Sequence, residues 1–127
     1  MLIRIEPESD IPIYKQLTNQ IFEGIASGAI RPGDSLPSVR SLAADLGVNM
    51  HTVNKSYHEL EKKGIIQIAP KSGAMISVPD GLNSTTIPRI TAEIRPLIAE
   101  ALAVGIDQVQ INQLVNSIIQ QLTGKNN

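Results

Sequence analysis

The amino-acid sequence predicts an α+β fold that is mostly helical. Two stretches with apolar residues at helical spacing, 38–46 and 50–63, are separated by a short turn and predict two adjoining helices. Alternating apolar residues follow directly and predict a β-hairpin. Two more amphipathic stretches in the C-terminal part predict a short helical tail. The chain is therefore expected to hold a small helical domain with a hairpin, followed by two helices.

The composition is typical of a soluble globular protein. The 127 residues suffice for one compact domain, or for a small domain with a short appendage. Hydrophobic residues make up 42% and charged residues 18% of the chain. The absence of cysteine excludes disulfides, zinc–thiolate sites and cysteine nucleophiles. Because no signal peptide and no run of about 18 apolar residues occurs, we expect a cytoplasmic protein without a membrane partner.

The first helix is predicted to run from Pro12 to about Ser27. Asp10 is a candidate N-terminal cap, Pro12 suits the first turn, and Gly28 ends the helix. The segment 31–37 is rich in helix-breaking residues, so we expect a loop there with at most one short strand. The apolar face of this helix comprises Ile13, Leu17, Ile21 and Ile25.

The next two helices meet at a short turn. The first begins at Ser38 and ends before Gly47, because glycine readily adopts the positive φ that the turn needs. Asn49 is a favoured cap for the second helix, which ends at Gly64. We expect Ala43 to face the helix crossing, where a small side chain lets the backbones approach. The apolar positions expected in the core are Val39, Leu42, Ala43, Leu46, Val53, Tyr57 and Leu60.

After the third helix, the sequence predicts a hairpin, a linker and a tail. We assign residues 1–80 to the first domain, 81–88 to a linker, and 89–127 to a two-helix tail. Pro96 lies within the first tail helix and is expected to kink it or to shift its start. The alternating apolar residues of the hairpin are Ile66, Ile68, Ile76 and Val78.

The tail carries two apolar stripes that a single chain would leave exposed. Soluble monomers rarely expose a large apolar patch. We therefore expect the tail to form a homodimer with a second copy of the chain, the alternative being that it folds back on the first domain. The residues expected in the dimer interface are Ile94, Leu97, Ile98, Leu102, Ile111, Leu114, Val115, Ile118, Ile119 and Leu122.

Two helices joined by a short turn and followed by a hairpin form a winged helix-turn-helix, which predicts binding to double-stranded DNA. In this arrangement the first turns of the second helix enter the major groove. Asn54 can bond adenine, Met50 can contact a thymine methyl, and Lys55 suits a phosphate. His51 and Thr52 can reach a base edge or a phosphate; alternatively, His51 is solvated and Thr52 supports the helix start.

The charge distribution favours DNA only weakly. The net charge is -1, whereas affinity for the phosphate backbone comes largely from lysine and arginine. Between Ser38 and Val78, five basic and three acidic side chains give a local charge of +2. We therefore expect a modest basic face, and a winged helix that binds other proteins without binding DNA remains an alternative.

A connected series of short segments runs through the first domain. They are Pro12-Ile13-Tyr14, the segment 28–40, Leu42-Ala43, Leu46-Gly47-Val48-Asn49, Thr52-Val53, Tyr57, Leu60-Glu61 and Lys63-Gly64-Ile65-Ile66. Together these segments resemble the GntR family of transcription regulators. The short tail is similar to that of the YtrA subfamily, whose members carry a small helical dimerisation segment in place of a large effector-binding domain.

The resemblance implies a transcription regulator, expected to be a repressor that binds an inverted-repeat operator. Arg40 matches an arginine that the family uses against DNA, the alternative being a surface ion pair with Asp45 or another carboxylate. Where the family's wing tip carries several arginines, the segment 69–75 keeps one glycine and one basic residue, Lys71. The DNA-binding residues expected in all are Ser38, Arg40, Met50, His51, Thr52, Asn54, Lys55, Lys71, Ser72 and Gly73.

Other functional classes find little support in the sequence. His51 and His58 share a helix face, but their spacing is not the i, i+4 spacing of a helical zinc site. No phosphate-cradling loop or nucleophile elbow occurs. Tyr14, Phe22 and Tyr57 lie in helical stripes and offer no stacking platform for RNA bases. We expect no enzyme activity, metal or cofactor, and the existence of a small-molecule effector stays open.

Overall fold

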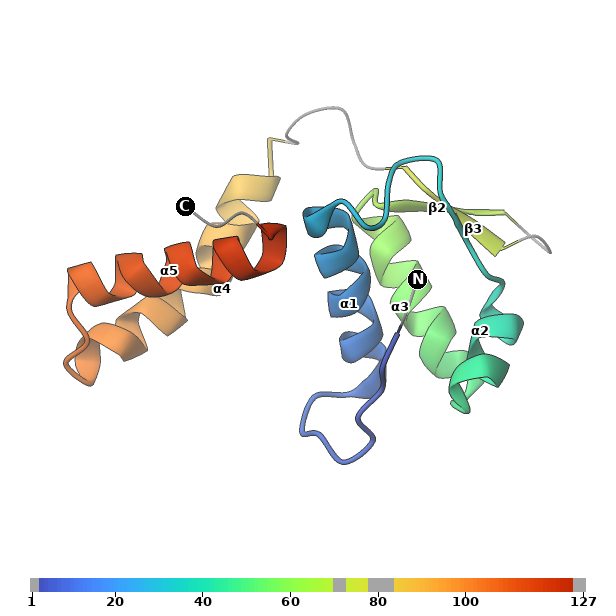
Figure 1. Ribbon diagram of the computed structural model, residues 1–127, viewed down its shortest axis with the longest axis horizontal. Helices are drawn as coiled ribbons and strands as arrows, with labels where there is room; N and C mark the ends of the chain where they lie inside the picture. Colours follow the sequence, from blue (N-terminus) through green and yellow to red (C-terminus); the bar gives the residue numbers. More distant parts are fainter. Residues whose placement is uncertain (1–2, 70–72, 78–83, 125–127) are drawn as a thin grey trace. The chain divides into compact units, whose positions relative to one another are not determined.

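The computed structural model describes residues 3–69, 73–77 and 84–124. The chain divides into two compact units, Met1–Val78 and Pro79–Asn127. The first unit holds three helices and a small sheet, and the second holds two helices (Figure 1). The predicted class, α+β and mostly helical, is confirmed.

The first unit has the element order of a winged helix-turn-helix. Its elements are α1 (Ile13–Ser27), β1 (Ser35–Leu36), α2 (Val39–Leu46), α3 (Met50–Lys62), β2 (Ile66–Ala69) and β3 (Gly73–Ile76). The strands form an antiparallel sheet in the order β1-β3-β2, so β3 pairs with both of the others. In the β2–β3 hairpin, Ile66 lies opposite Ile76 and Ile68 lies opposite Ala74. The hairpin therefore directly follows α3, as the sequence predicted.

The ends of α2 and α3 lie where the capping residues place them. Ser38 caps α2, and its Oγ accepts a hydrogen bond from the Ser41 amide at 3.1 Å. Asn49 caps α3, and its Oδ1 accepts from the His51 amide at 2.8 Å. Gly47 ends α2 with a φ of 69°, a left-handed conformation that glycine adopts without strain. The predicted turn between the two helices is thereby confirmed.

The start of α1 differs from the prediction. Pro12 is the N-terminal cap, and no side chain caps the helix. Asp10 lies two residues before that cap, so the prediction that it caps α1 was wrong. A capping side chain must reach the amides two or three residues inside the helix from the cap position itself. The predicted end is confirmed, because Gly28 follows Ser27 with a φ of 84°.

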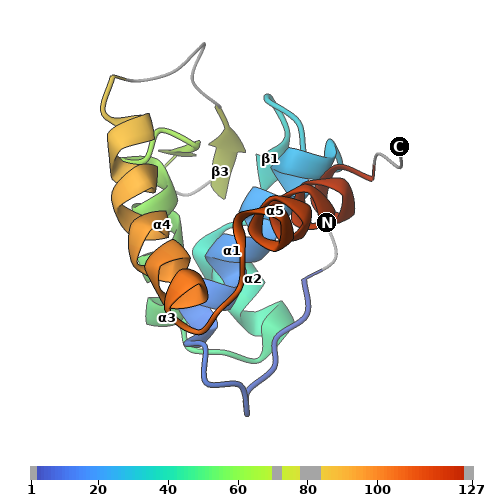
Figure 2. The ribbon, with the colours of Figure 1, turned by 90° about the vertical axis from the view of Figure 1, so that its left-hand side faces the viewer.

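The core of the first unit lies between the three helices and one face of the sheet. In Figures 1 and 2, α1 and α3 lie side by side, and α2 crosses the start of α3. The buried apolar residues are Leu17, Ile21, Ile30, Leu36, Leu42, Ala43, Val53, Tyr57, Leu60, Ile66, Ala74 and Ile76. One side of the first turns of α3 thus packs against the core, and the opposite side is exposed to solvent.

A pair of buried hydroxyl groups also joins α1 to α3. Thr18 Oγ1 lies 2.7 Å from Ser56 Oγ, and both residues have no exposed surface. Thr18 Oγ1 also donates to the Tyr14 carbonyl at 2.9 Å. Because a hydroxyl has a single hydrogen, Ser56 is the donor in the Thr18–Ser56 bond.

The second unit consists of α4 (Thr86–Ala103) and α5 (Gln108–Thr123). α4 begins inside the segment expected to be linker, because Pro88 falls in the first turn, where its missing amide costs nothing. Pro96 neither ends α4 nor shifts its start. Between the helices, Asp107 caps α5 in a reciprocal capping box with Gln110. The two helices leave this turn in different directions (Figures 1 and 2), and neither contains a buried residue.

Among the described residues, no helix has both the length and the apolar character needed to cross a bilayer.

Candidate nucleic-acid interface

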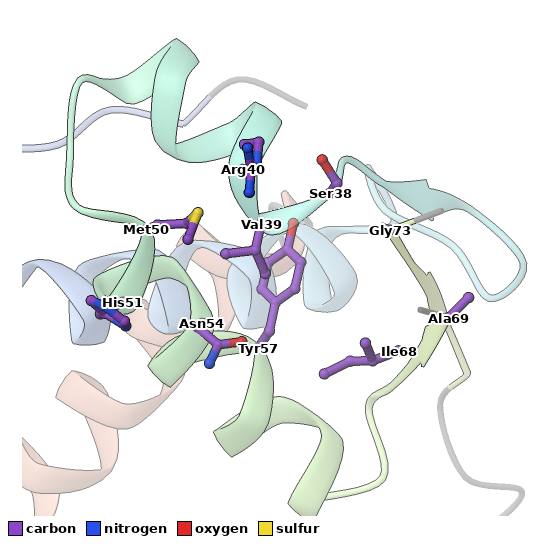
Figure 3. A pocket seen from close by; sticks show the side chains of 10 residues that line it. All are labelled: Ser38, Val39, Arg40, Met50, His51, Asn54, Tyr57, Ile68, Ala69 and Gly73. Atoms are coloured by element: carbon purple, nitrogen blue, oxygen red, sulfur yellow. The ribbon is translucent and has the colours of Figure 1, made fainter. Parts of the chain in front are cut away.

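A hollow of about 570 Å³ lies between the starts of α2 and α3 and the hairpin (Figure 3). The two helix starts meet there because the three-residue turn at 47–49 brings α3 back across α2. The hairpin closes the third side because it follows α3 after only a short connection. The lining residues are Ser38, Val39, Arg40, Met50, His51, Asn54, Tyr57, Ile68, Ala69 and Gly73.

Most of the sequence-predicted DNA-binding residues gather at this hollow. Those that line it are Ser38, Arg40, Met50, His51, Asn54 and Gly73. Thr52 and Lys55 lie on the same helix, α3, but do not line the hollow. Lys71 and Ser72 fall outside the described residues. Val39, Tyr57, Ile68 and Ala69 also line the hollow and were not predicted to do so, since their apolar positions indicated only core or strand packing.

Among the described residues that line the hollow, Arg40 is the only lysine, arginine, aspartate or glutamate. Its side chain is exposed and projects from the start of α2 (Figure 3). The ion pair with Asp45 that the sequence left open does not form, and Arg40 has no other ion-pair partner within the described residues. The guanidinium group is therefore available to a ligand that binds at the hollow between the starts of α2 and α3.

Met50 and His51 occupy the first turn of α3 and are both exposed, Met50 to 41%. Asn54 follows one turn later and is half-buried. Figure 3 shows all three side chains on the part of α3 that borders the hollow. An exposed helix start with an amide, an imidazole and a thioether can offer hydrogen bonds and an apolar contact to base edges.

Lys55 is oriented by an aromatic ring on α1. Its Nζ lies 4.1 Å from the centre of the Tyr14 ring, a cation–π contact. The residue as a whole is exposed. The sequence placed Tyr14 only in a helical stripe, because nothing local indicated which part of α3 would lie against α1.

Two other lysines share one carboxylate within the protein. Glu59 Oε1 lies 3.1 Å from Lys15 Nζ and 3.2 Å from Lys63 Nζ. Burial alone would raise the pKa of Glu59, but the hydrogen bonds and charges of the two lysines lower it by more, so the pKa lies below its usual value. Lys63 also lies over the Phe22 ring, with Nζ 5.6 Å from its centre. These contacts tie α1 to α3, and the single carboxylate compensates one of the two lysine charges.

Tyr57 packs in the core, as predicted, and is 1% exposed. Its hydroxyl donates a hydrogen bond to the Pro37 carbonyl at 2.7 Å, just before α2 begins. Burial raises the pKa of Tyr57 to about 12, so the hydroxyl keeps its proton at neutral pH.

The histidines do not assemble a metal site within the described residues. His58 Nδ1 lies 3.9 Å from Glu61 Oε1, and no third ligand-type side chain joins them in that part of the chain. His51 faces the hollow instead.

Comparison with known families decides between the possible roles of this winged helix. Residues 13–76 match the family described as "Bacterial regulatory proteins, gntR family". The chain belongs to the GntR family. The matched range runs from the start of α1 to the end of β3, so it includes every element around the hollow. The resemblance seen in the sequence is confirmed.

One curated relative is similar over nearly the whole of this GntR-family protein. It is "HTH-type transcriptional repressor YtrA" of Bacillus subtilis (strain 168), 34% identical over 125 residues. The alignment covers 97% of this chain and 96% of the relative. The similarity therefore extends through the tail, and the assignment to the YtrA type is confirmed.

Solved structures of similar proteins cover both units. "Transcriptional Antiterminator from Listeria monocytogenes EGD-e" has a TM-score of 0.89 at 26% identity, covering 100% of this chain and 96% of that chain. "YtrA from Sulfolobus acidocaldarius, a GntR-family transcription factor" has a TM-score of 0.65 at 42% identity, and the match covers 81% of this chain and 99% of that chain. "AraR(DBD) in complex with operator ORE1" has a TM-score of 0.50 at 25% identity, and the match covers 61% of this chain and 94% of that chain.

This GntR-family protein is therefore a transcriptional regulator with a GntR-type DNA-binding domain. Its relatives are regulators of transcription, which implies a role in DNA binding rather than in catalysis.

Proposed function

We propose that this GntR-family protein is a transcriptional repressor that acts in the cytoplasm and binds an inverted-repeat operator as a homodimer. The observation that carries the proposal is the hollow itself, where the exposed Arg40 of α2 lies beside the first turn of α3 without an ion-pair partner in the described chain. A helix start of this kind fits the major groove of B-DNA.

The polar and exposed side chains at the starts of α2 and α3 are assigned contacts with DNA in this proposal. Asn54 reads adenine through its amide, and Met50 contacts a thymine methyl. Arg40 contacts a guanine edge or a phosphate at the start of α2. His51 and Thr52 reach a base edge or a phosphate, and Ser38 contacts the backbone beside them.

The remaining contacts fix the position of the protein on the duplex. Lys55 binds a phosphate, supported by the ring of Tyr14 behind it. The wing contributes weakly, with Gly73, Ser72 and Lys71 approaching the minor groove. Because Lys71 is the sole basic residue of the wing tip, major-groove readout carries most of the specificity.

The tail supplies the dimer in this proposal. Leu97, Leu102 and Leu114 are 65%, 55% and 53% exposed, respectively, in the single chain. A second copy would cover these side chains in an interface of at least about 1,000 Å². The interface residues that we propose are those of the two stripes: Ile94, Leu97, Ile98, Leu102, Ile111, Leu114, Val115, Ile118, Ile119 and Leu122.

A groove on α4 supports a helical partner for the tail. Its volume is about 450 Å³. The lining residues are Thr91, Ile94, Arg95, Ile98, Ala99 and Leu102. Small side chains at 91 and 99 leave room for the ridge of another helix between larger neighbours, which is how helices commonly pack.

Repression is the regulatory mode that this architecture favours. A dimer that covers a promoter blocks RNA polymerase without making any further contact. The relative YtrA is itself named as a repressor. The small tail leaves little room to enclose an effector, so we assign no ligand to it.

Genomic footprinting of the purified protein tests this function. We expect protected sites with two-fold symmetry, whose half-sites lie about one helical turn, roughly 10 base pairs, apart. Transcription from a promoter that carries such a site should fall when the protein is added. No protected site at low salt would instead favour the alternative of a winged helix that binds other proteins.

A further inference from the structure

The segment Leu36–Ser38 is held between two elements of the DNA-binding domain. It connects β1 to α2 and ends at the N-terminal cap of α2. On one side lies Tyr57 of α3, and on the other lies Gly73 of β3. The recognition helix and the hairpin therefore meet at the residues where α2 begins.

Within the part of the chain that the structure describes, the Tyr57 hydroxyl makes one hydrogen bond, to the Pro37 carbonyl at 2.7 Å. Figure 3 shows the ring beneath the hollow with its hydroxyl directed to the segment before α2. The ring is fixed by the core, since the residue is 1% exposed. Tyr57 thus acts as a rigid spacer between α3 and the residue that precedes Ser38.

Gly73 closes the other side of the same segment by direct backbone contact. A Cβ at this position would lie 2.5 Å from the Leu36 carbonyl oxygen and 3.2 Å from the Ser38 amide nitrogen. No larger residue fits there without moving one of the backbones. The segment is therefore confined, and small movements of Pro37 pass directly to Ser38 and Arg40.

We propose that Tyr57 is a positioning residue for DNA recognition, whose hydroxyl sets the start of α2 relative to α3 so that Ser38 and Arg40 meet the DNA in register with Asn54. This inference rests on the proposed DNA-binding function. Without the hydroxyl, the Pro37 carbonyl loses its partner and the start of α2 moves relative to the recognition helix. The ring itself need not contact DNA.

The test compares Tyr57→Phe with Ser56→Ala in the full-length protein. Tyr57→Phe removes one buried hydroxyl and keeps the ring that packs in the core. Ser56→Ala removes the neighbouring buried hydroxyl of α3, which bonds Thr18 on the side away from the hollow. Both variants are expected to fold, as circular dichroism will verify, with similar small losses in melting temperature.

Affinity for the operator is expected to distinguish the two variants. Tyr57→Phe should bind the operator about fivefold more weakly, the loss that one hydrogen bond implies, whereas Ser56→Ala should bind as the unmodified protein does. In an Arg40→Ala background the Tyr57→Phe loss should shrink, because the side chain being positioned is absent. A purely structural role predicts the same loss in both backgrounds.

The binding results distinguish a failure of this inference from a failure of the proposed DNA-binding function. If the unmodified protein binds no DNA, the proposed function and this inference both fall. If it binds its operator and Tyr57→Phe binds equally well, the positioning role of Tyr57 alone is overturned. An equal loss with and without Arg40 would likewise overturn it.

Discussion

At the scale of single residues, the domain separates cations that are free to meet DNA from cations that are already engaged. Arg40 is exposed and unpaired within the described chain, while Lys63 is bound to Glu59. Lys55 lies between these cases, because its ammonium group lies over the Tyr14 ring while the residue is exposed. Counting lysines and arginines in the sequence therefore overstates the charge that the domain offers to phosphates.

Replacing Arg40 tests its contact with the operator. If Arg40 contacts a base edge rather than a phosphate, Arg40→Ala should lower operator affinity by about 1–3 kcal/mol, because a bidentate contact is lost. Fluorescence anisotropy with an operator duplex and an unrelated duplex measures the loss. The loss should be confined to the operator, and unchanged operator affinity would remove Arg40 from the interface.

Lys55→Ala is the matched control for that experiment. A phosphate contact carries no sequence information, so this variant should weaken binding to both duplexes by the same factor. It should also reduce the salt slope by about 1.

At the scale of elements, α3 is fixed to its neighbours by polar links as well as by the core. The Thr18–Ser56 pair and the Lys15–Glu59 ion pair join it to α1. The Tyr57 hydroxyl joins it to the segment before α2. The recognition helix is thus held along its length while its first turns stay exposed.

The ion pairs of Glu59 predict a dependence of stability on pH. The pKa of Glu59 is lowered from its usual value of 4.5, so its contribution is present above that value and is lost as the pH falls through the folded-state pKa. Glu59→Gln should therefore destabilise the protein at pH 7, and the difference should vanish in strong acid. Urea unfolding at both pH values measures this.

Glu23→Gln serves as the control for Glu59, since Glu23 is exposed on α1 and has no ion-pair partner among the described residues. Its substitution should leave the stability unchanged at either pH. A Glu59→Gln protein as stable as the original at pH 7 would show that the ion pairs stabilise nothing.

The hairpin should matter less for DNA binding than the recognition helix. Lys71→Ala removes one charge from the wing tip, whereas Asn54→Ala removes a direct reader of base edges. We expect the second change to cost more operator affinity than the first in the same anisotropy assay. If Lys71→Ala abolished binding while Asn54→Ala left it intact, the assignment of the recognition surface would be reversed.

The elements could be predicted from the sequence because their ends depend on local residues. Gly47 and Asn49 mark a turn and a cap whatever the rest of the chain does. The contacts of Tyr57 with Pro37 and of Lys55 with Tyr14 could not be predicted, because each joins residues far apart in the sequence. The error at Asp10 arose within the same local reasoning, because a polar residue near the helix start suggested a side-chain cap, whereas α1 begins at Pro12 without one.

At the scale of the whole molecule, the two units differ in how they are stabilised. The first unit has a continuous core of buried apolar residues. The second unit has none, since no residue of α4 or α5 is buried. A tail of this kind needs a partner surface to be stable, and in the proposed dimer a second copy would supply one with matching stripes.

A charge placed in the α5 stripe tests the dimer. Ile118→Asp should produce a monomer in analytical ultracentrifugation, because an aspartate in the interface would be buried without a partner. Operator affinity should fall by more than any single contact accounts for, since one half-site is then bound alone. The first unit should stay folded, as its own core is unchanged.

Asn116→Asp provides the matched control, because Asn116 lies on the same helix between the apolar positions and is exposed. This variant adds the same charge outside the stripe and should remain a dimer. An Ile118→Asp protein that still sediments as a dimer and still holds its operator would contradict the proposed interface.

Since no residue of α4 or α5 is buried, the proposed dimer would link the activity of this regulator to its abundance. In the proposed dimer, the tail gains a core only when two copies meet, so its stability depends on the protein concentration. At low copy number the amount of dimer rises with the square of the amount of chain. A cell that makes half as much of the protein would then lose roughly three quarters of its occupied operators. In this proposal, a fall in the cellular concentration of the chain would by itself weaken repression.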